Sequence, residues 1–365
     1  MKDDNKKYFP VEEVSGTPIQ MGESIGESQK EVLKNFFSMT LDRINKGRGG
    51  EQSFRDIGLI SIDFAKKTAK ESIEYVEEYS PDIFEEIKGI SNSSGLKIWE
   101  VMLLNIRNQL GIAFDSGCTS IGVSREKSQS GNNIIGQNWD NDPELDKFSL
   151  VLIRKPKNKP NFISFTQPGL MAYIGFNDEG LGICMNALMA PGKGSGVPWY
   201  FIVRKIFEQN SYKNVIKQVE SAKRAIPANA FITTTSELFD LEITDSQVET
   251  LFPDANGVLI HTNHCVHPKF SKIADDYPDL IESKARFPRA QTFFDRKSES
   301  ITSDDFKNIL MNHEEYPRSI CRHENEHPET GFWTTTISVI INPSENKMDL
   351  TRGNPCSNEY VTYKL

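Results

Sequence analysis

The sequence predicts an α+β fold in which helices cover the outer faces of two packed, largely antiparallel sheets. Up to about residue 115, apolar side chains recur at helical spacing, whereas beyond it they alternate with a period of two. Strand-like and helix-like runs are segregated rather than alternating, which disfavours a doubly wound parallel sheet. The 365 residues, 37% of them hydrophobic, suffice for one large or two ordinary domains with a sizeable core.

The first third of the chain has the pattern of consecutive helices. Residues 28–44 and 97–110 place apolar side chains along one face, and residues 51–79 form a longer, mostly helical stretch. The Ser-Pro pair at 80–81 marks a helix start, because proline is favoured at the first helical position. We therefore expect residues 1–117 to form a helical N-terminal segment.

The rest of the chain, residues 118–365, has the pattern of short strands separated by turns, and we expect it to form one integrated domain with the helical segment. Helical patterns interrupt the strands at residues 198–210, 212–225, 280–296 and 303–313. Strand-like runs occur at residues 118–124, 132–140, 148–155, 161–167, 172–177, 180–188, 231–237, 238–244, 247–252, 257–263, 333–343 and 347–353.

Composition excludes several classes of protein. The net charge of −9 disfavours a broad nucleic-acid-binding face, which needs a basic surface. No apolar run approaches the roughly 18 residues that a membrane helix needs. Five cysteines in a chain of this length do not suggest a disulfide framework, and the first residues lack the apolar core of a secretory signal. We therefore expect a cytoplasmic protein that binds neither nucleic acid nor membrane.

Cys118 is the first candidate for chemistry, because it lies where helical pattern gives way to strand pattern and directly follows Gly117. A buried core cysteine is the simpler interpretation, since free cysteine is among the most buried residue types. If the Gly117–Cys118 bond were cut, however, the new α-amino group could serve as the base for the thiol. Its pKa of about 7.7–8.0 suits that role, and no histidine would be needed.

Two further polar residues stand at the ends of predicted strands. Asp140 closes the next run, 22 residues after Cys118, and antiparallel pairing could bring its carboxylate beside the cysteine. Asn263 follows an apolar run, and its amide could donate to an oxyanion, a role worth about 2.7–4 kcal/mol. Each could instead simply end a strand before a turn.

Histidines raise the alternative of a zinc enzyme. His323 and His327 match the H-E-x-x-H pattern of zinc metallopeptidases, which must be helical for both rings to share a face. Pro328 disfavours helix at His327, so we expect a polar loop. A papain-type pairing of Cys118 with a histidine is also possible, but the papain sequence around the cysteine is absent.

The ordered motifs DSGCTSIGV, GQNWD, GFNDEGLGICMNAL and GVLIHTNHC resemble the acyl-coenzyme A:6-aminopenicillanic acid acyltransferase family, peptidase family C45 of the N-terminal-nucleophile (Ntn) hydrolases. The opening VSGTPIQMGESIGES and the closing WTTTISVIINPSENKMDLTRGNPC are similar to the family's first and last segments, so the resemblance spans nearly the whole chain. It implies a four-layer αββα sandwich. It also implies a precursor that cuts itself between Gly117 and Cys118 into two chains that stay together.

The resemblance implies roles for five residues. Cys118 would be the nucleophile with its own amine as base, Asp140 would lie near that amine, and Asn263 would be the oxyanion donor. Asn186 is similar to a second asparagine of choloylglycine hydrolases, and Arg286 to an arginine that they place near the cysteine.

One residue departs from part of this pattern, and it bears on the substrate. The bile-salt and fatty-ethanolamide branches carry arginine three residues before the aspartate, whereas this chain has Gln137 there. We therefore expect an enzyme that hydrolyses or transfers acyl groups at an amide or thioester and needs no metal or organic cofactor. The alternatives are a zinc metallopeptidase using His323 and His327, or an uncut, non-catalytic relative that binds acylated ligands.

Overall fold

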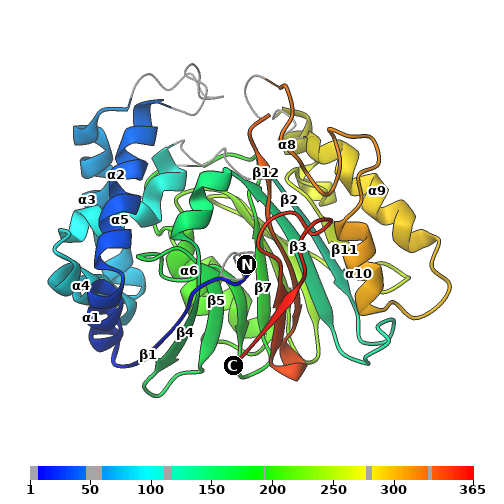
Figure 1. Ribbon diagram of the computed structural model, residues 1–365, viewed down its shortest axis with the longest axis horizontal. Coiled ribbons are helices and arrows are strands. Elements are labelled where there is room, and N and C mark those ends of the chain that lie inside the picture. Colours follow the sequence, from blue (N-terminus) through cyan, green and yellow to red (C-terminus); the bar gives the residue numbers. More distant parts are fainter. Residues whose placement is uncertain (1–6, 47–59, 111–116, 193, 277–281, 328–330) are drawn as a thin grey trace, which may run out of the picture.

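The computed structural model describes residues 7–46, 60–110, 117–192, 194–276, 282–327 and 331–365. Two sheets pack face to face, and helices cover both outer faces, so the layers follow the order helix, sheet, sheet, helix (Figure 1). The predicted α+β class, with helical layers outside a pair of sheets, is confirmed.

The N-terminal part supplies most of one helical layer, at the left of Figure 1. Its elements are β1 (Val11–Gly16), α1 (Pro18–Ser28), α2 (Lys30–Lys46), α3 (Ile62–Tyr79), α4 (Pro81–Ser94) and α5 (Ile98–Ile106). Helices α2 to α5 follow the predicted helical patterns, and α4 begins with Pro81 as expected. Helix α1 was not predicted.

The packing of α1 on α4 explains how a glycine-rich segment becomes helical. A Cβ at Gly22 would lie 2.1 Å from the carbonyl oxygen of Glu86, and a Cβ at Gly89 would lie 2.2 Å from that of Ile19. Glycine is required at both positions because the two backbones touch. The buried contact therefore compensates for the low helix propensity of glycine.

The sheet next to this layer has the strand order β1-β4-β5-β6-β7-β8-β9-β10, with a parallel β1–β4 pair and antiparallel pairs elsewhere. Its further strands are β4 (Leu150–Pro156), β5 (Phe162–Thr166), β6 (Ile174–Asn177), β7 (Gly182–Asn186), β8 (Ala228–Thr233), β9 (Leu238–Ile243) and β10 (Val248–Leu251). Helices α6 (Trp199–Ile206) and α7 (Tyr212–Ser221) complete the outer layer on this side.

The second sheet is antiparallel throughout, in the order β11-β2-β3-β12-β13-β14. Its strands are β2 (Gly117–Val123), β3 (Ile134–Asn141), β11 (Val258–His261), β12 (Thr334–Asn342), β13 (Lys347–Leu350) and β14 (Val361–Lys364). Its outer face packs against α9 (Ser283–Asp295) and α10 (Ser303–Leu310), and the short α8 (Ser271–Asp276) lies nearby (Figure 1).

Alternation along β2 decides which side chains reach the inside of the sandwich. Cys118 belongs to the large hydrophobic cluster that joins the N-terminal helices to both sheets. Ile121 and Val123 belong instead to the cluster beneath α9 and α10. The cysteine side chain therefore faces the inner layer, whereas its neighbour Thr119 faces α9.

Candidate active site

Cys118 is the second residue of β2 and lies opposite Trp139 of β3. Its side chain has no exposed surface. Burial raises the pKa of the thiol far above its ordinary value, and the Asp140 carboxylate raises it further. The Arg286 guanidinium lowers that pKa, and the Ala187 backbone and the Asn263 side chain lower it further. In the uncut chain the thiol is therefore neutral and closed off from water.

Asn263 is held directly beside the cysteine. It lies two residues beyond β11, and its Oδ1 accepts a hydrogen bond from the Cys118 backbone N–H at 2.9 Å. Its Nδ2 donates to the carbonyl oxygen of Ala187 at 3.0 Å, and its backbone N–H donates to Ser283 Oγ at 2.7 Å. The predicted neighbourhood of Cys118 and Asn263 is thus present, although 145 residues separate them.

Arg286 reaches the same point from helix α9. Its Nη1 donates to the carbonyl oxygen of Cys118 at 2.5 Å and to Thr119 Oγ1 at 2.7 Å, and its Nη2 donates to Asn263 Oδ1 at 2.6 Å. The side chain is buried, and burial lowers the pKa of the guanidinium while Asp140 opposes that shift. A buried guanidinium here fixes the backbone at the cysteine and the orientation of the Asn263 amide.

Asp140 lies on the outer side of β3, opposite Gly117 rather than opposite the thiol. Its Oδ1 accepts a hydrogen bond from Thr335 Oγ1 at 2.6 Å, whereas its buried Oδ2 has no hydrogen-bond partner among the described residues. Burial raises the pKa of this carboxyl to about 6, although Arg286 lowers it. The chain therefore holds a carboxylate with an unused acceptor beside the bond that precedes Cys118.

The hydrogen bonds of the Asn186 side chain go to residues other than Cys118. Its Nδ2 donates to the carbonyl oxygens of His261 and Thr262, at 3.3 and 2.8 Å, and its Oδ1 accepts from Ser120 Oγ at 2.6 Å. The backbone of the next residue, Ala187, accepts a hydrogen bond from Asn263 Nδ2 and lowers the pKa of the Cys118 thiol. The CMNAL motif thus reaches the site through its backbone, while the asparagine ties β7 to β11 and β2.

Gln137 occupies the position where two related branches carry arginine. It is buried, and its Nε2 donates to Ser120 Oγ at 3.0 Å and to the carbonyl oxygen of Met185 at 2.9 Å. It also donates to Asn186 Oδ1. The nitrogen of this neutral amide is therefore hydrogen-bonded within the protein, whereas its buried Oε1 has no hydrogen-bond partner among the described residues.

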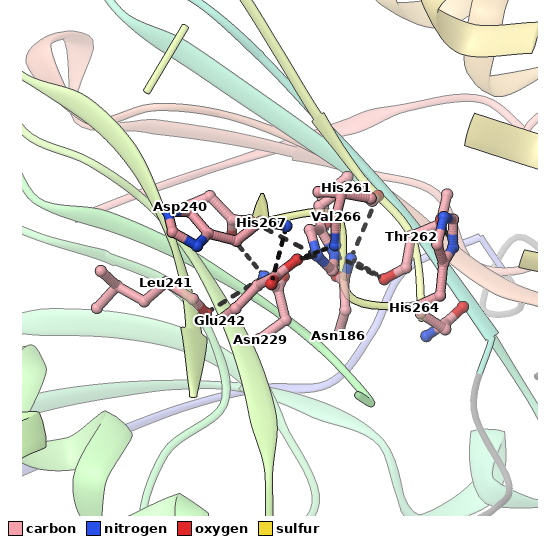
Figure 2. Close-up of polar contacts among 12 residues, drawn as sticks. Asn186, Asn229, Asp240, Leu241, Glu242, His261, Thr262, His264, Val266 and His267 are labelled. Carbon is pink, nitrogen blue, oxygen red and sulfur yellow. Dashed lines mark hydrogen bonds and ion pairs between the residues drawn. The ribbon is translucent and has the colours of Figure 1, made fainter. Parts of the chain in front are cut away.

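A second buried polar network supports the two segments that carry Ala187 and Asn263 (Figure 2). His261 Nε2 lies 2.9 Å from Glu242 Oε1, and its Nδ1 lies 2.9 Å from the carbonyl oxygen of Thr262. Because both ring nitrogens face acceptors, the ring donates twice and carries a positive charge. The Thr262 carbonyl oxygen also accepts a hydrogen bond from Asn186. The His261–Glu242 ion pair therefore stabilises the backbone next to both Ala187 and Asn263.

Histidine takes no part in the contacts of Cys118 in the described residues, which disfavours a papain-type pair. The segment that carries His323 and His327 contains no helix between residues 321 and 327, as expected for a polar loop. The two rings therefore lack the shared helical face that a metallopeptidase needs. His323 instead contacts another histidine and two cysteines in a separate cluster at the edge of the second sheet.

Three residues of the site were not found by sequence reasoning, namely Ala187, Ser283 and Thr335. Each contributes a backbone group or a hydroxyl, and such contributions carry no distinctive sequence signal. Asp115 and Ser116, the first residues of the DSGCTSIGV motif, lie outside the described residues. No helix in the described parts of the chain combines the length and apolar character needed to cross a bilayer.

The sequence is similar to that of one family of acyltransferases over most of its length. The family model "AAT: Acyl-coenzyme A:6-aminopenicillanic acid acyl-transferase" matches residues 125–357. The chain is 26% identical over 318 residues to the "Acyl-coenzyme A:6-aminopenicillanic-acid-acyltransferase 40 kDa form" of Emericella nidulans. That alignment covers 81% of this chain and 86% of the relative.

Two solved structures were also found to be similar. A mutant of the conjugated bile acid hydrolase from Clostridium perfringens has a TM-score of 0.45 at 13% identity, covering 68% of this chain and 97% of that chain. Penicillin V acylase from Agrobacterium tumefaciens has a TM-score of 0.44 at 9% identity, covering 68% of this chain and 86% of that chain.

Proposed function

The chain belongs to the acyl-coenzyme A:6-aminopenicillanic acid acyl-transferase family, and we propose that it is a self-processing cysteine hydrolase or acyltransferase that works through an acyl-enzyme on Cys118. One observation carries the proposal. The Asn263 side chain accepts a hydrogen bond from the backbone N–H of Cys118, the first residues of β2 are buried with it, and a buried carboxylate oxygen without a hydrogen-bond partner among the described residues flanks the preceding bond.

The first step would convert the precursor. The Cys118 sulfur attacks the carbonyl carbon of Gly117, the peptide C–N bond breaks, and the thiol proton ends on the departing nitrogen. Gly117 is then held as a thioester, which water hydrolyses to a new carboxylate and a free thiol. The product has an α-chain of residues 1–117 and a β-chain of residues 118–365.

Cutting this bond would give the Asp140 carboxylate a partner. Gly117 lies opposite Asp140 in the β2–β3 pairing, and the Cys118 nitrogen already donates to Asn263 Oδ1 at 2.9 Å. Once freed, the same nitrogen becomes an ammonium group between an amide oxygen and a carboxylate. A charged amine there satisfies the Asp140 oxygen that lacks a hydrogen bond in the uncut chain.

The mature amine would then act as the base in the acyl-transfer cycle. An α-amine has a pKa of about 7.7–8.0, so a useful fraction is neutral near pH 7 and can accept the thiol proton. The thiolate attacks the substrate carbonyl, and the ammonium returns the proton to the leaving amine or thiol. Water, or an acceptor amine, then releases the acyl group from Cys118.

Two donors are available for the negative charge that develops on the substrate oxygen. The Asn263 side chain and the Ala187 backbone both lower the pKa of the Cys118 thiol in the uncut chain, so we propose the Asn263 Nδ2–H and the Ala187 N–H as these donors. A carbonyl carbon bonded to the sulfur would bring its oxygen near the same two groups. Such preorganised donors each contribute about 2.7–4 kcal/mol where one has been removed and measured.

The proposed substrates are acyl amides or acyl thioesters. The matched family description and the relative from Emericella nidulans both name an acyl-coenzyme A and an amine acceptor, which suggests this pair of chemistries. Gln137, a neutral side chain whose Nε2 is hydrogen-bonded within the protein, gives no support for the bile-salt or fatty-ethanolamide branches. Hydrolysis is the default reaction because water is always present.

The deciding experiment is the intact mass of freshly purified protein, with N-terminal sequencing of any fragment. We expect pieces of 117 and 248 residues, about 13 and 28 kDa of the 41.3 kDa chain, with the larger beginning Cys-Thr-Ser-Ile. Cys118→Ala is the matched control and should remain uncut. Cys118→Ser should process slowly and lose most acyl transfer.

Fragment patterns and acyl labelling together decide the outcome. Fragments from the wild type but not from Cys118→Ala, together with a covalent acyl adduct on the larger fragment after brief exposure to an acyl thioester, would support the proposal. A wild-type chain that stays whole on incubation would refute self-processing. Identical fragments from Cys118→Ala would show that another protease makes the cut.

A further inference from the structure

Four metal-binding side chains converge at the edge of the second sheet, away from the Cys118 thiol. His313 follows α10, Cys321 and His323 precede β12, and Cys356 lies between β13 and β14. Their sulfur and nitrogen atoms all lie within 4.8 Å of one another. We refer to these four residues as the Cys2His2 cluster.

Four of the six separations within the cluster are close to those of ligands around one tetrahedral ion, and all six are within 4.8 Å. The two sulfurs are 3.8 Å apart, His323 Nε2 lies 3.7 and 3.4 Å from Cys321 Sγ and Cys356 Sγ, and the two histidine Nε2 atoms are 3.0 Å apart. Zinc bonds of about 2.3 Å to sulfur and 2.0–2.1 Å to nitrogen, at tetrahedral angles, give about 3.8, 3.6 and 3.3 Å for these three kinds of pair. We propose that the Cys2His2 cluster binds one structural Zn²⁺ ion.

The chemistry of the four groups favours zinc. Thiolate and neutral imidazole are the donors that zinc prefers in closed structural sites, whereas calcium and magnesium require oxygen. Two thiols lose their protons on binding, so the doubly charged ion is neutralised by two thiolates. Four protein ligands leave no open position for water or substrate, so the ion would have a structural role and take no part in the acyl transfer.

The surroundings of Cys321 are those of a supported ligand. The side-chain amide of Asn354 donates to Cys321 Sγ at 3.7 Å and to the carbonyl oxygen of Arg322 at 2.6 Å. The Cys321 backbone N–H donates to the carbonyl oxygen of Asn312 at 3.0 Å. An N–H aimed at a sulfur stabilises the thiolate form, as groups in the outer shell of metal sites do.

The ion would stabilise one side of the active site through Arg322, which lies between the ligands Cys321 and His323 in the sequence. The Arg322 backbone N–H donates to Thr335 Oγ1 at 2.9 Å, and that hydroxyl donates to Asp140 Oδ1 at 2.6 Å. The Arg322 guanidinium also pairs with Glu282, at the start of α9, at 2.8 Å. Loss of the ion would therefore loosen Thr335 and Asp140 without removing any reacting group.

The proposal departs from our expectation that the protein needs no metal, and it differs from the H-E-x-x-H alternative. In that alternative His327 is a ligand and His313 is not. In the Cys2His2 cluster His313 is a ligand and His327 is not, and Cys321 and Cys356 are ligands as well. The two histidines therefore give a matched pair of variants, His313→Gln and His327→Gln.

The test is metal content by mass spectrometry on full-length protein purified from zinc-supplemented cells without a metal-affinity tag. Wild type and His327→Gln should hold about one zinc ion per chain, whereas His313→Gln and Cys356→Ser should hold several-fold less. Should these two variants fail to fold, wild-type protein stripped by a chelator and given Co²⁺ provides a second readout. It should develop a thiolate-to-cobalt absorption band and regain the thermal midpoint lost on stripping.

Three results would overturn the inference. The first is negligible zinc in wild type with no cobalt–thiolate band. The second is loss of zinc in His327→Gln but not in His313→Gln, which would indicate the metallopeptidase pairing. The third is a peptide map of the freshly purified protein in which Cys321 and Cys356 are joined as a disulfide. None of these readouts depends on self-processing at Cys118, so failure of the proposed function would leave this test intact.

Discussion

Gly117 and Asp140 lie directly opposite each other where β2 pairs with β3, so a buried carboxylate flanks the bond that precedes Cys118. In the uncut chain Asp140 Oδ2 has no hydrogen-bond partner among the described residues. Burial raises the pKa of this carboxyl from 3.8 to about 6. Ionisation of the buried Asp140 carboxylate therefore destabilises the uncut precursor. Cleavage of the Gly117–Cys118 bond would supply an ammonium group that compensates for this cost.

The pH dependence of precursor stability tests this cost of ionising Asp140. A raised pKa in the folded state means that protonation favours folding, so the contribution is fully present below about pH 4 and is lost as pH rises through about 6. A shift of about two pKa units corresponds to roughly 3 kcal/mol. In the uncut Cys118→Ala background, Asp140→Asn should therefore raise the free energy of unfolding at pH 8 by up to that amount, and much less at pH 4.

Urea unfolding at the two pH values measures this difference. Asp275→Asn, in the same background, is the control, because Asp275 is an exposed carboxylate of α8. Equal changes at pH 4 and pH 8 for Asp140→Asn would contradict a penalty for ionising Asp140. In the processed wild type the sign should reverse, because the new ammonium would then lose its partner.

Asn263 offers a prediction about the rate of catalysis. Asn263→Ala should lower kcat of processed enzyme by roughly 10²–10³, because one of the two oxyanion donors is removed. Asn263→Asp should show a similar loss, although it keeps an oxygen to accept from Cys118 N–H and from Arg286. Steady-state kinetics that separate kcat from KM provide the measurement.

The comparison of the two variants separates catalysis from positioning. If Asn263→Asp retained most of the turnover while Asn263→Ala lost it, the oxygen of the side chain would matter and the donor role would be wrong. Unchanged kcat in both would make Asn263 a turn residue. Thermal unfolding of each variant shows whether a loss of rate merely reflects a loss of folded protein.

The sequence could predict that Cys118 and Asp140 are neighbours, because the two residues lie on consecutive strands. Cys118 and Asp140 lie on consecutive runs of alternating residues connected by residues 124–133, so antiparallel pairing brings the two runs together. The alternation also predicts that neighbouring side chains point to opposite faces. Asn263 and Arg286 are different, since each comes from an element more than a hundred residues away. Their placement beside Cys118 was expected from a family resemblance, not from residue patterns.

The residues that were missed share a physical reason. Thr335 and Ser283 act through single hydroxyls, and Ala187 acts through its backbone, so neither polarity nor periodicity marks them. The Cys2His2 cluster was missed because its ligands come from separate segments, with Cys356 lying 35 positions after Cys321. A search for histidines at helical spacing pairs His323 with His327, whereas the folded chain pairs His323 with His313.

The ion pair of His261 with Glu242 yields a prediction for stability. Burial raises the pKa of Glu242, but the hydrogen bond and charge of His261 together with the Val266 and His267 backbone N–H groups outweigh burial and hold that pKa below 4.5. Burial lowers the pKa of His261, but Asp240 and Glu242 outweigh it and hold that pKa above 6.5. The pair therefore stabilises fully between about pH 4.5 and 6.5, and less as pH falls below or rises above that window.

Glu242→Gln should lower the free energy of unfolding by about 3–5 kcal/mol within this window, because a buried charge loses its partner. Glu78→Gln is the matched control, since the Lys223–Glu78 pair is largely exposed, is screened by solvent and should contribute far less than the buried pair. Denaturant unfolding at pH 6 measures both. Equal small losses would show that His261 is neutral and that the network is an ordinary set of hydrogen bonds.

The contact of α1 with α4 gives a prediction in which two effects have opposite signs. Helix propensity alone makes Gly89→Ala stabilising by about 1 kcal/mol. The new Cβ, however, would lie 2.2 Å from the Ile19 carbonyl oxygen and 2.8 Å from the Glu23 nitrogen, both backbone atoms that cannot rotate away. Such overpacking typically costs about 1–3 kcal/mol, so a net loss of stability is expected. Ser24→Ala, on the exposed face of α1, should change the free energy of unfolding by less than about 0.5 kcal/mol. Urea unfolding of the two variants decides the sign, and a Gly89→Ala chain more stable than wild type would show that α1 can move away from α4 without loss.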